Sequence, residues 1–118
     1  MSQTPNLSCD QLHQKAMDEA NDAMIAEKKG QKDQALEHYK LAFQYEKEAA
    51  MTMAYDFTIE PSRSVLFRSA AFLAIKAKLY QDAERMAAFG LIGNPPAEIA
   101  MELREALQET LNHLKVAA

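Results

Sequence analysis

The residues that could carry chemistry in this chain are three histidines, one cysteine and scattered carboxylates. Asp10 and His13 have an acidic-x-x-His spacing, but a di-iron helical bundle needs two Glu-x-x-His pairs and two further glutamates. Cys9 lies in no pattern typical of a nucleophile, and the chain lacks a phosphate-binding glycine loop, a zinc-protease motif and a nucleophile elbow. We therefore expect no catalytic residue, cofactor or metal ligand, and we interpret His13, His38 and His113 as solvated helix residues.

Two arginines and one glutamate raise the question of charge pairing. Arg63 and Arg68 lie near the start of an expected helix, where they could bind an acidic peptide through bidentate hydrogen bonds. The alternative, which we favour, is an intramolecular pair with Glu60 or with the acidic helix that precedes them. Glu46 falls on the apolar side of that preceding helix, and a buried carboxylate needs a partner. We predict that an arginine of the following helix fills this role.

Composition limits the classes of protein to consider. The 118 residues fit one domain, which at this size buries about two-thirds of the surface of the unfolded chain. A formal net charge of -4 argues against a nucleic-acid binder, because the only local basic stretch consists of Arg63, Arg68, Lys76 and Lys78. One cysteine cannot form an internal disulfide, and no apolar run reaches the roughly 20 residues of a membrane span. We expect no nucleic-acid or membrane partner and a cytoplasmic location.

One spacing of residues occurs twice along the chain. Around Gly30 and around Lys78, small or aromatic residues stand 7 positions before and 5, 9 and 12 positions after the central residue. Small residues on both sides of a turn let two helices pack closely, so each stretch predicts a helical hairpin. The members are Ala23, Ala35, Tyr39 and Ala42 in the first stretch, and Ala71, Ala83, Ala87 and Gly90 in the second.

The whole pattern predicts an all-α fold of five helices, with two stacked helix-turn-helix hairpins and a C-terminal capping helix. Helix-favouring residues are abundant and β-branched residues are few, so we expect no sheet. Residues 1–7 show no periodicity and are predicted to be a flexible N-terminal arm. Residues 8–118 are predicted to form a single helical domain.

Start and stop signals set the expected helix boundaries. Ser8 and Gln11 have capping-box spacing and begin a helix that Gly30 ends. The second helix starts near Lys32 and meets no breaker before Pro61, so we expect an overlong helix of about 25 residues. The third begins at Pro61, the fourth spans 81–91, and the last has one charged face and one apolar face, the latter made by Ile99, Leu103, Leu107, Leu111 and Leu114.

These residues resemble the tetratricopeptide repeat, a helix-turn-helix unit of about 34 residues with small residues at fixed positions. Gly30 and Lys78 are 48 residues apart, so about 14 residues are expected to extend the second helix beyond the family's unit. The first unit matches through Ala23, Gly30, Ala35, Tyr39 and Ala42, and the second through Ala71, Tyr80, Ala83, Gly90 and Pro95.

The resemblance implies a protein that binds a peptide or helix of a partner on the inner face of the first helix of each hairpin. Methionine side chains adapt to varied partners. Met24 suits a surface and a core equally, whereas we expect Met51 and Met53 to be buried. Carried over position by position, the partner-binding residues would be Met17, Met24, Lys28, Val65, Arg68, Phe72, Ile75 and Lys76.

We interpret the chain as a non-catalytic interaction module, an adaptor or scaffold whose groove is lined by the first and third helices. One alternative is a homodimer formed through the overlong second helix, with Met53 and Phe57 at the contact. A remote alternative is a small helical enzyme or metal-binding protein.

Overall fold

The computed structural model describes residues 6–116, so residues 1–5 of the expected N-terminal arm lie outside the described range. Within this range the chain forms five helices and no strand, which confirms the all-α class. The helices are α1 (Cys9–Lys28), α2 (Lys32–Met51), α3 (Ser62–Lys76), α4 (Tyr80–Leu91) and α5 (Ala97–Val116).

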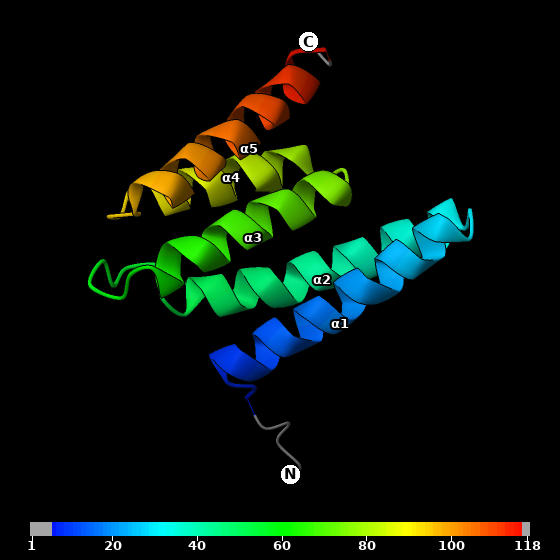
Figure 1. Cartoon of the computed structure of the whole chain (residues 1–118), viewed down its shortest axis with the longest axis horizontal. Coiled ribbons are helices and arrows are strands. Elements are labelled where there is room, and N and C mark those ends of the chain that lie inside the picture. Colours follow the sequence, from blue (N-terminus) through cyan, green and yellow to red (C-terminus); the bar gives the residue numbers. More distant parts are fainter. Residues whose placement is uncertain (1–5, 117–118) are drawn as a thin grey trace.

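The five helices are arranged in two layers (Figure 1). In that view α1, α3 and α5 lie in the near layer, and α2 and α4 lie behind them. Each helix packs on the next one in the sequence, and α3 also packs on α5. The core lies between the layers, around Phe43 and Phe67, which are almost completely buried. As a result, α1 and α5 form the two ends of the stack.

The expected capping box begins α1. The hydroxyl oxygen of Ser8 accepts a hydrogen bond of 3.1 Å from the amide of Gln11, and the side-chain oxygen of Gln11 accepts one of 2.8 Å from the amide of Ser8. Both bonds satisfy amides that a helix start leaves without an intrahelical partner. The start of the first helix is therefore confirmed at the level of individual hydrogen bonds.

The two hairpin turns share one backbone geometry. Gly30 and Lys78 both adopt the left-handed conformation, with φ of 74° and 61°. In each turn the amide of this residue donates to the carbonyl three positions earlier, and the next amide donates to the carbonyl five positions earlier. The residues at the shared offsets are also buried on both hairpins. The repeated spacing therefore corresponds to two equivalent hairpins.

The second helix is shorter than expected. It ends at Met51 after 20 residues, and the residues expected to extend it form a loop that leads to Pro61. The hydroxyl of Thr52 donates to the carbonyl of Ala49, and the carboxylate of Asp56 accepts from both the amide and the hydroxyl of Thr58. Such side-chain bonds compete with helical hydrogen bonds, so they end a helix without proline or glycine.

The guanidinium group of Arg63, at the start of α3, is completely buried against this loop. Its Nε and Nη2 atoms donate to the carbonyl oxygen of Ala54, at 3.1 and 2.8 Å. Nη2 also donates to the carbonyl of Phe89 at 2.7 Å, and Nη1 to that of Gly90 at 3.4 Å. Arg63 therefore joins the loop to the last turn of α4, and the expected ion pair with Glu60 or α2 is wrong, because backbone carbonyls occupy its donors.

Two aromatic rings enclose this guanidinium group. Its central carbon lies 4.8 Å from the ring centroid of Phe57 and 4.9 Å from that of Phe67. Burial lowers the pKa of Arg63, while the negative charge of Glu60 raises it. A side chain at position 93 would meet Nη1 at 2.4 Å, so Gly93 is required for the loop after α4 to approach Arg63.

The last helix covers the stack with most of the predicted stripe: Ile99 and Leu103 are buried, and Leu107 packs against the core. Its buried residues include Leu103 and Ala106, whereas Leu111 is 41% exposed. At Gly90 of α4 the two helices approach closely, since an added Cβ would lie 2.7 Å from the side chain of Leu103. The predicted stripe is therefore confirmed at Ile99, Leu103 and Leu107 and wrong at Leu111.

Replacing Arg63 tests how much the loop depends on it. Arg63→Leu should lower the free energy of unfolding by more than about 3 kcal/mol, because three buried carbonyls lose their donors. Arg63→Lys should recover only part of this loss, because one ammonium group cannot span both the loop and α4. Urea unfolding followed by helical circular dichroism measures both values. An Arg63→Leu protein within about 1 kcal/mol of wild type would contradict this role.

Substitutions at the two left-handed positions should have opposite effects. Gly30→Ala should lower the free energy of unfolding by about 1 kcal/mol, because a Cβ is strained at this φ. Lys78→Gly should leave stability unchanged or raise it by up to about 1 kcal/mol, because the same strain is relieved. Thermal unfolding of both variants checks the prediction, and a loss of stability in both would refute the equivalence of the two turns.

Candidate functional site

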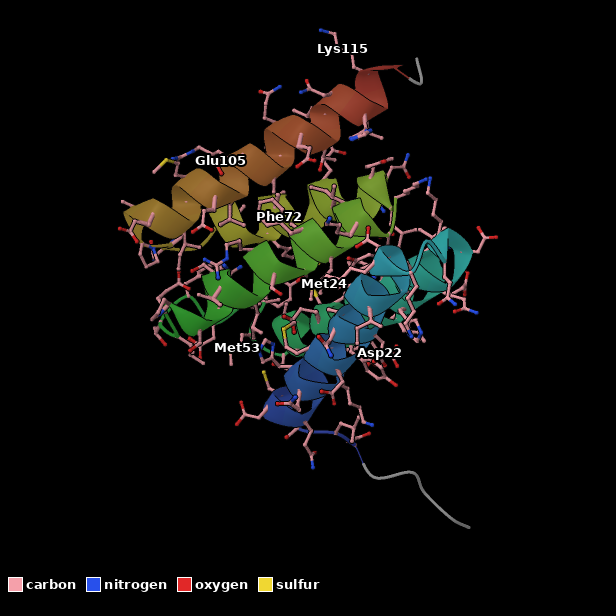
Figure 2. All side chains as sticks on the ribbon, turned by 45° about the vertical axis from the view of Figure 1, so that its right-hand side comes forward. Asp22, Met24, Met53, Phe72, Glu105 and Lys115 are labelled. Carbon is pink, nitrogen blue, oxygen red and sulfur yellow. The ribbon has the colours of Figure 1, made fainter. Side chains whose placement is uncertain are left out.

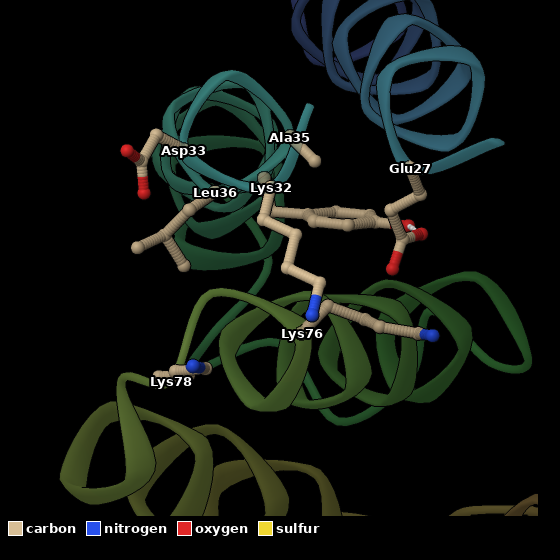
Figure 3. A pocket seen from close by; sticks show the side chains of 8 residues that line it. Glu27, Lys32, Asp33, Ala35, Leu36, Lys76 and Lys78 are labelled. Atoms are coloured by element: carbon tan, nitrogen blue, oxygen red, sulfur yellow. Dashed lines mark hydrogen bonds between the residues drawn. The ribbon is translucent and has the colours of Figure 1, made fainter. Parts of the chain in front are cut away.

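A cavity of about 360 Å³ opens between the two hairpin turns. Figure 3 shows it from close by, with side chains contributed by the end of α1, the start of α2, the end of α3 and the turn before α4. We call it the lysine pocket, and its lining consists of Glu27, Lys32, Asp33, Ala35, Leu36, Tyr39, Lys76 and Lys78.

Three of these lining residues are lysines from separate segments of the chain. Within residues 6–116, no carboxylate oxygen lies within 4.0 Å of the ammonium nitrogen of Lys32, Lys76 or Lys78. Glu27 and Asp33 also line the pocket, but the carboxylate of Glu27 accepts a hydrogen bond from the hydroxyl of Tyr39. The three ammonium groups therefore remain available to an anionic group from outside.

Tyr39 links the pocket to the core. Its side chain is buried, and the ammonium nitrogen of Lys76 lies 5.9 Å from its ring centroid. Burial, and then the hydrogen bond and negative charge of Glu27, raise the pKa of Tyr39 to about 12. The hydroxyl therefore stays protonated and keeps Glu27 beside the ring, while Lys76 is held over one edge of the cavity.

Six of the eight predicted partner-binding residues lie on α1 and α3, and we call this set the α1/α3 face: Met17, Met24 and Lys28 from α1, and Val65, Ile75 and Lys76 from α3. Met24 is 48% exposed, and Figure 2 shows it where α1 approaches α3. Met17 and Ile75 are partly buried and pack against the core. Whereas α1 packs on α2, α3 packs on both α2 and α4, and Lys76 also lines the lysine pocket.

The other two predicted residues lie toward α5. Arg68 donates a hydrogen bond of 3.0 Å to the carboxylate of Glu102, so its pair is intramolecular, as favoured, but with a different helix from the one expected. Figure 2 shows Phe72 on the side of α3 that faces α5. These residues therefore contribute to the contact of the capping helix.

The structure corrects the predicted partner of Glu46 and shows that each histidine, though at least partly exposed, has a neighbouring side chain. Nδ1 of His13 lies 2.9 and 3.0 Å from the two carboxylate oxygens of Glu46, which is completely buried. The partner of Glu46 is thus a histidine of α1 and not an arginine of α3, because Arg63 points to backbone carbonyls. Nδ1 of His38 lies 2.7 Å from Glu19, and the ring of His113 stacks on Tyr80.

Of the pocket lysines, Lys76 is among the predicted partner-binding residues, whereas Lys32 and Lys78 are not and had only partial signals in the sequence. Lys76 and Lys78 belong to the only basic stretch, and Lys32 occupies a turn position where the resembled family usually has an aromatic residue. Residues 32 and 76 lie on different hairpins, so no helical periodicity in the sequence indicates that they line the same pocket. The three lysines come together only when α2 packs on α3.

A second exposed surface lies at the opposite end of α3, on the loop that replaces the expected helix extension. Tyr55 is 78% exposed, Phe57 40% and Ile59 38%, and Ile92 at the end of α4 is 59% exposed. Met51 and Met53 are partly buried and pack against the core. The residues proposed for dimerisation through a long helix are thus divided between the core and this loop.

The pKa of Tyr39 gives a prediction about alkaline pH. Because its folded pKa of about 12 lies above the unfolded value of 10.0, this group stabilises the protein fully below pH 10 and loses that contribution as pH rises toward 12. Tyr39→Phe should make stability less dependent on pH in this window. Urea unfolding of wild type and variant at several alkaline pH values measures the difference, and parallel curves would contradict it.

Comparisons with protein-family models, curated proteins and solved structures found no match. The resemblance to tetratricopeptide repeats therefore stays a prediction from the spacing of residues in the sequence. Among residues 6–116, no helix is long and apolar enough to cross a membrane.

Proposed function

We propose that this protein is a non-catalytic, cytoplasmic interaction module of the tetratricopeptide-repeat-like type. It binds an amphipathic acidic segment of a partner protein, as a peptide or a helix, on the α1/α3 face. An acidic group of that segment lies in the lysine pocket. The observation that carries the proposal is the group of three lysines, which have no carboxylate partner among residues 6–116, beside partly exposed apolar side chains.

Charge complementarity favours an acidic partner segment. Lys32, Lys76 and Lys78 line one cavity, so an incoming carboxylate is attracted by more than one ammonium group. The overall net charge of -4 repels acidic proteins in general, which restricts their binding to this one locally basic pocket. Orientation and specificity would therefore come from the pocket.

Apolar contacts on the α1/α3 face supply the remaining affinity. Met24 is half-exposed and flexible, so its side chain can adjust to the partner's apolar residues. Met17 and Ile75 are already packed against the core and lose little conformational freedom on binding. An amphipathic helix that binds such a surface contacts it through apolar residues spaced three and four positions apart.

Self-association is a second candidate function, and the exposed loop surface favours it. Tyr55, Phe57 and Ile92 expose apolar rings and chains at the end of the molecule that is remote from the lysine pocket. Two copies could bury these side chains against one another without using the α1/α3 face. Mass measurement in solution separates this function from partner binding by a monomer.

Affinity capture with matched variants tests the proposed face. The wild-type protein should capture a partner from a lysate of cells that naturally produce it. Met24→Glu should weaken binding at least about tenfold by placing a charge in an apolar contact. Lys78→Gly should weaken it about threefold to tenfold by removing one ammonium group, while glycine keeps the left-handed conformation of the turn. Calorimetry with the recovered partner's acidic segment measures both losses.

Leu41→Glu is the matched control, because Leu41 is 46% exposed on α2 and lies outside the α1/α3 face. It should bind as wild type does. Raising the salt concentration should weaken wild-type binding more than that of Lys78→Gly, since one charge contact is missing in the variant. Equal binding by Met24→Glu, Lys78→Gly and Leu41→Glu would remove this face as the binding site.

A further inference from the structure

Three potential metal ligands converge on the first hairpin. Glu19 and Asp22 lie one turn apart on α1, and His38 lies on α2. Each offers one ligand atom, and these three atoms lie within 4.8 Å of one another. Figure 2 shows Asp22 on the opposite side of α1 from Met24, so the cluster is separate from the α1/α3 face.

The charges of this cluster are incompletely balanced. In the part of the chain that the structure describes, neither Glu19 nor Asp22 has a lysine or arginine nitrogen within 4.0 Å. Nδ1 of His38 lies 2.7 Å from Glu19, and a neutral imidazole leaves two negative charges side by side. A dication would compensate both carboxylates, whereas protonation of His38 compensates only one.

The distances are compatible with coordination after small side-chain movements. Zinc binds imidazole nitrogen and carboxylate oxygen at about 2.0–2.2 Å, which places neighbouring ligand atoms about 3.3 Å apart in a tetrahedral site. Here Nδ1 of His38 lies 2.7 Å from an oxygen of Glu19, and the ligand atoms of all three residues lie within 4.8 Å of one another. The side chains of Glu19 and His38 are 25% and 36% exposed, so they have room to rotate and water can complete the coordination.

The helices that carry the ligands are firmly packed, which limits the cost of assembling the site. Ala23 of α1 and Ala35 and Ala42 of α2 are buried in the contact that joins the hairpin. Because the backbones are already in place, binding has to order only three side chains. This distinguishes the cluster from carboxylates scattered on one helix, since the nitrogen ligand comes from the neighbouring helix.

We propose that Glu19, Asp22 and His38 bind a zinc-class dication, which joins α1 to α2. One oxygen of each carboxylate and Nδ1 of His38 are the protein ligands, and water occupies the remaining position. Nδ1 exchanges its hydrogen bond with Glu19 for the metal, and the neutral imidazole carries its proton on Nε2. The imidazole ligand favours zinc, cobalt or nickel over magnesium and calcium, which prefer oxygen alone.

Calorimetric titration of tag-free, metal-stripped protein with zinc chloride tests this site. Wild type should bind one zinc ion, and its thermal midpoint should rise by roughly 5–10 °C at saturating zinc, because the metal binds only the folded hairpin. His38→Gln and Asp22→Asn should each weaken binding at least about tenfold. Magnesium at the same concentration should neither bind nor shift the midpoint.

His113→Gln is the matched control, since His113 is exposed and stacks on Tyr80 away from the cluster. It should bind zinc as wild type does, which separates this site from general binding by surface histidines. Asp22 is exposed, so Asp22→Asn keeps the fold and remains informative if His38→Gln unfolds. Zinc binding by Asp22→Asn within about threefold of wild type, or no saturable binding by wild type, would overturn the proposal.

Discussion

The buried guanidinium group of Arg63 is the interaction on which the arrangement of the second hairpin depends. A buried cation is costly unless its donors are occupied, and here three backbone carbonyls accept from it. The carbonyls of Phe89 and Gly90 lie in the last turn of α4, where the helix dipole places partial negative charge. The third, from Ala54, belongs to the loop. One side chain thus aligns the entry of α3, the end of α4 and the loop between the hairpins.

Close contacts between small residues determine how the remaining helices stack. Alanines at equivalent positions let α1 pack on α2 and α3 on α4, and Gly90 lets α5 approach α4. Such contacts position the helix backbones closely, and they leave larger side chains such as Met24 and Leu111 at the rim. The two-layer arrangement that results brings α1, α3 and α5 to one side of the molecule.

The proposed sites differ in their chemistry and in their position on the molecule. The lysine pocket lies between the two hairpin turns, whereas the carboxylate and histidine cluster lies on the first hairpin alone. Since α1 and α2 contribute to both, a metal that joins these helices would also restrain one wall of the pocket. The exposed aromatic loop lies at the other end of α3, where Arg63 holds its base. The three surfaces are therefore separate in space.

The sequence by itself determined the five helices, the capping box at Ser8 and the two equivalent turns, because these depend on residues close together along the chain. The predicted partner-binding residues, by contrast, followed from the resemblance to a repeat family, and of these Lys76 lines the lysine pocket. Only the tertiary structure decided that the residues after Met51 form a loop, since Arg63 from the following helix holds this loop in addition to the local bonds of Thr52 and Asp56. The same reason applies to the His13–Glu46 pair, the lysine pocket and the Glu19–Asp22–His38 cluster, because their members come from different helices. Packing between helices brings these side chains together, and the spacing of residues along the chain does not indicate which ones will meet.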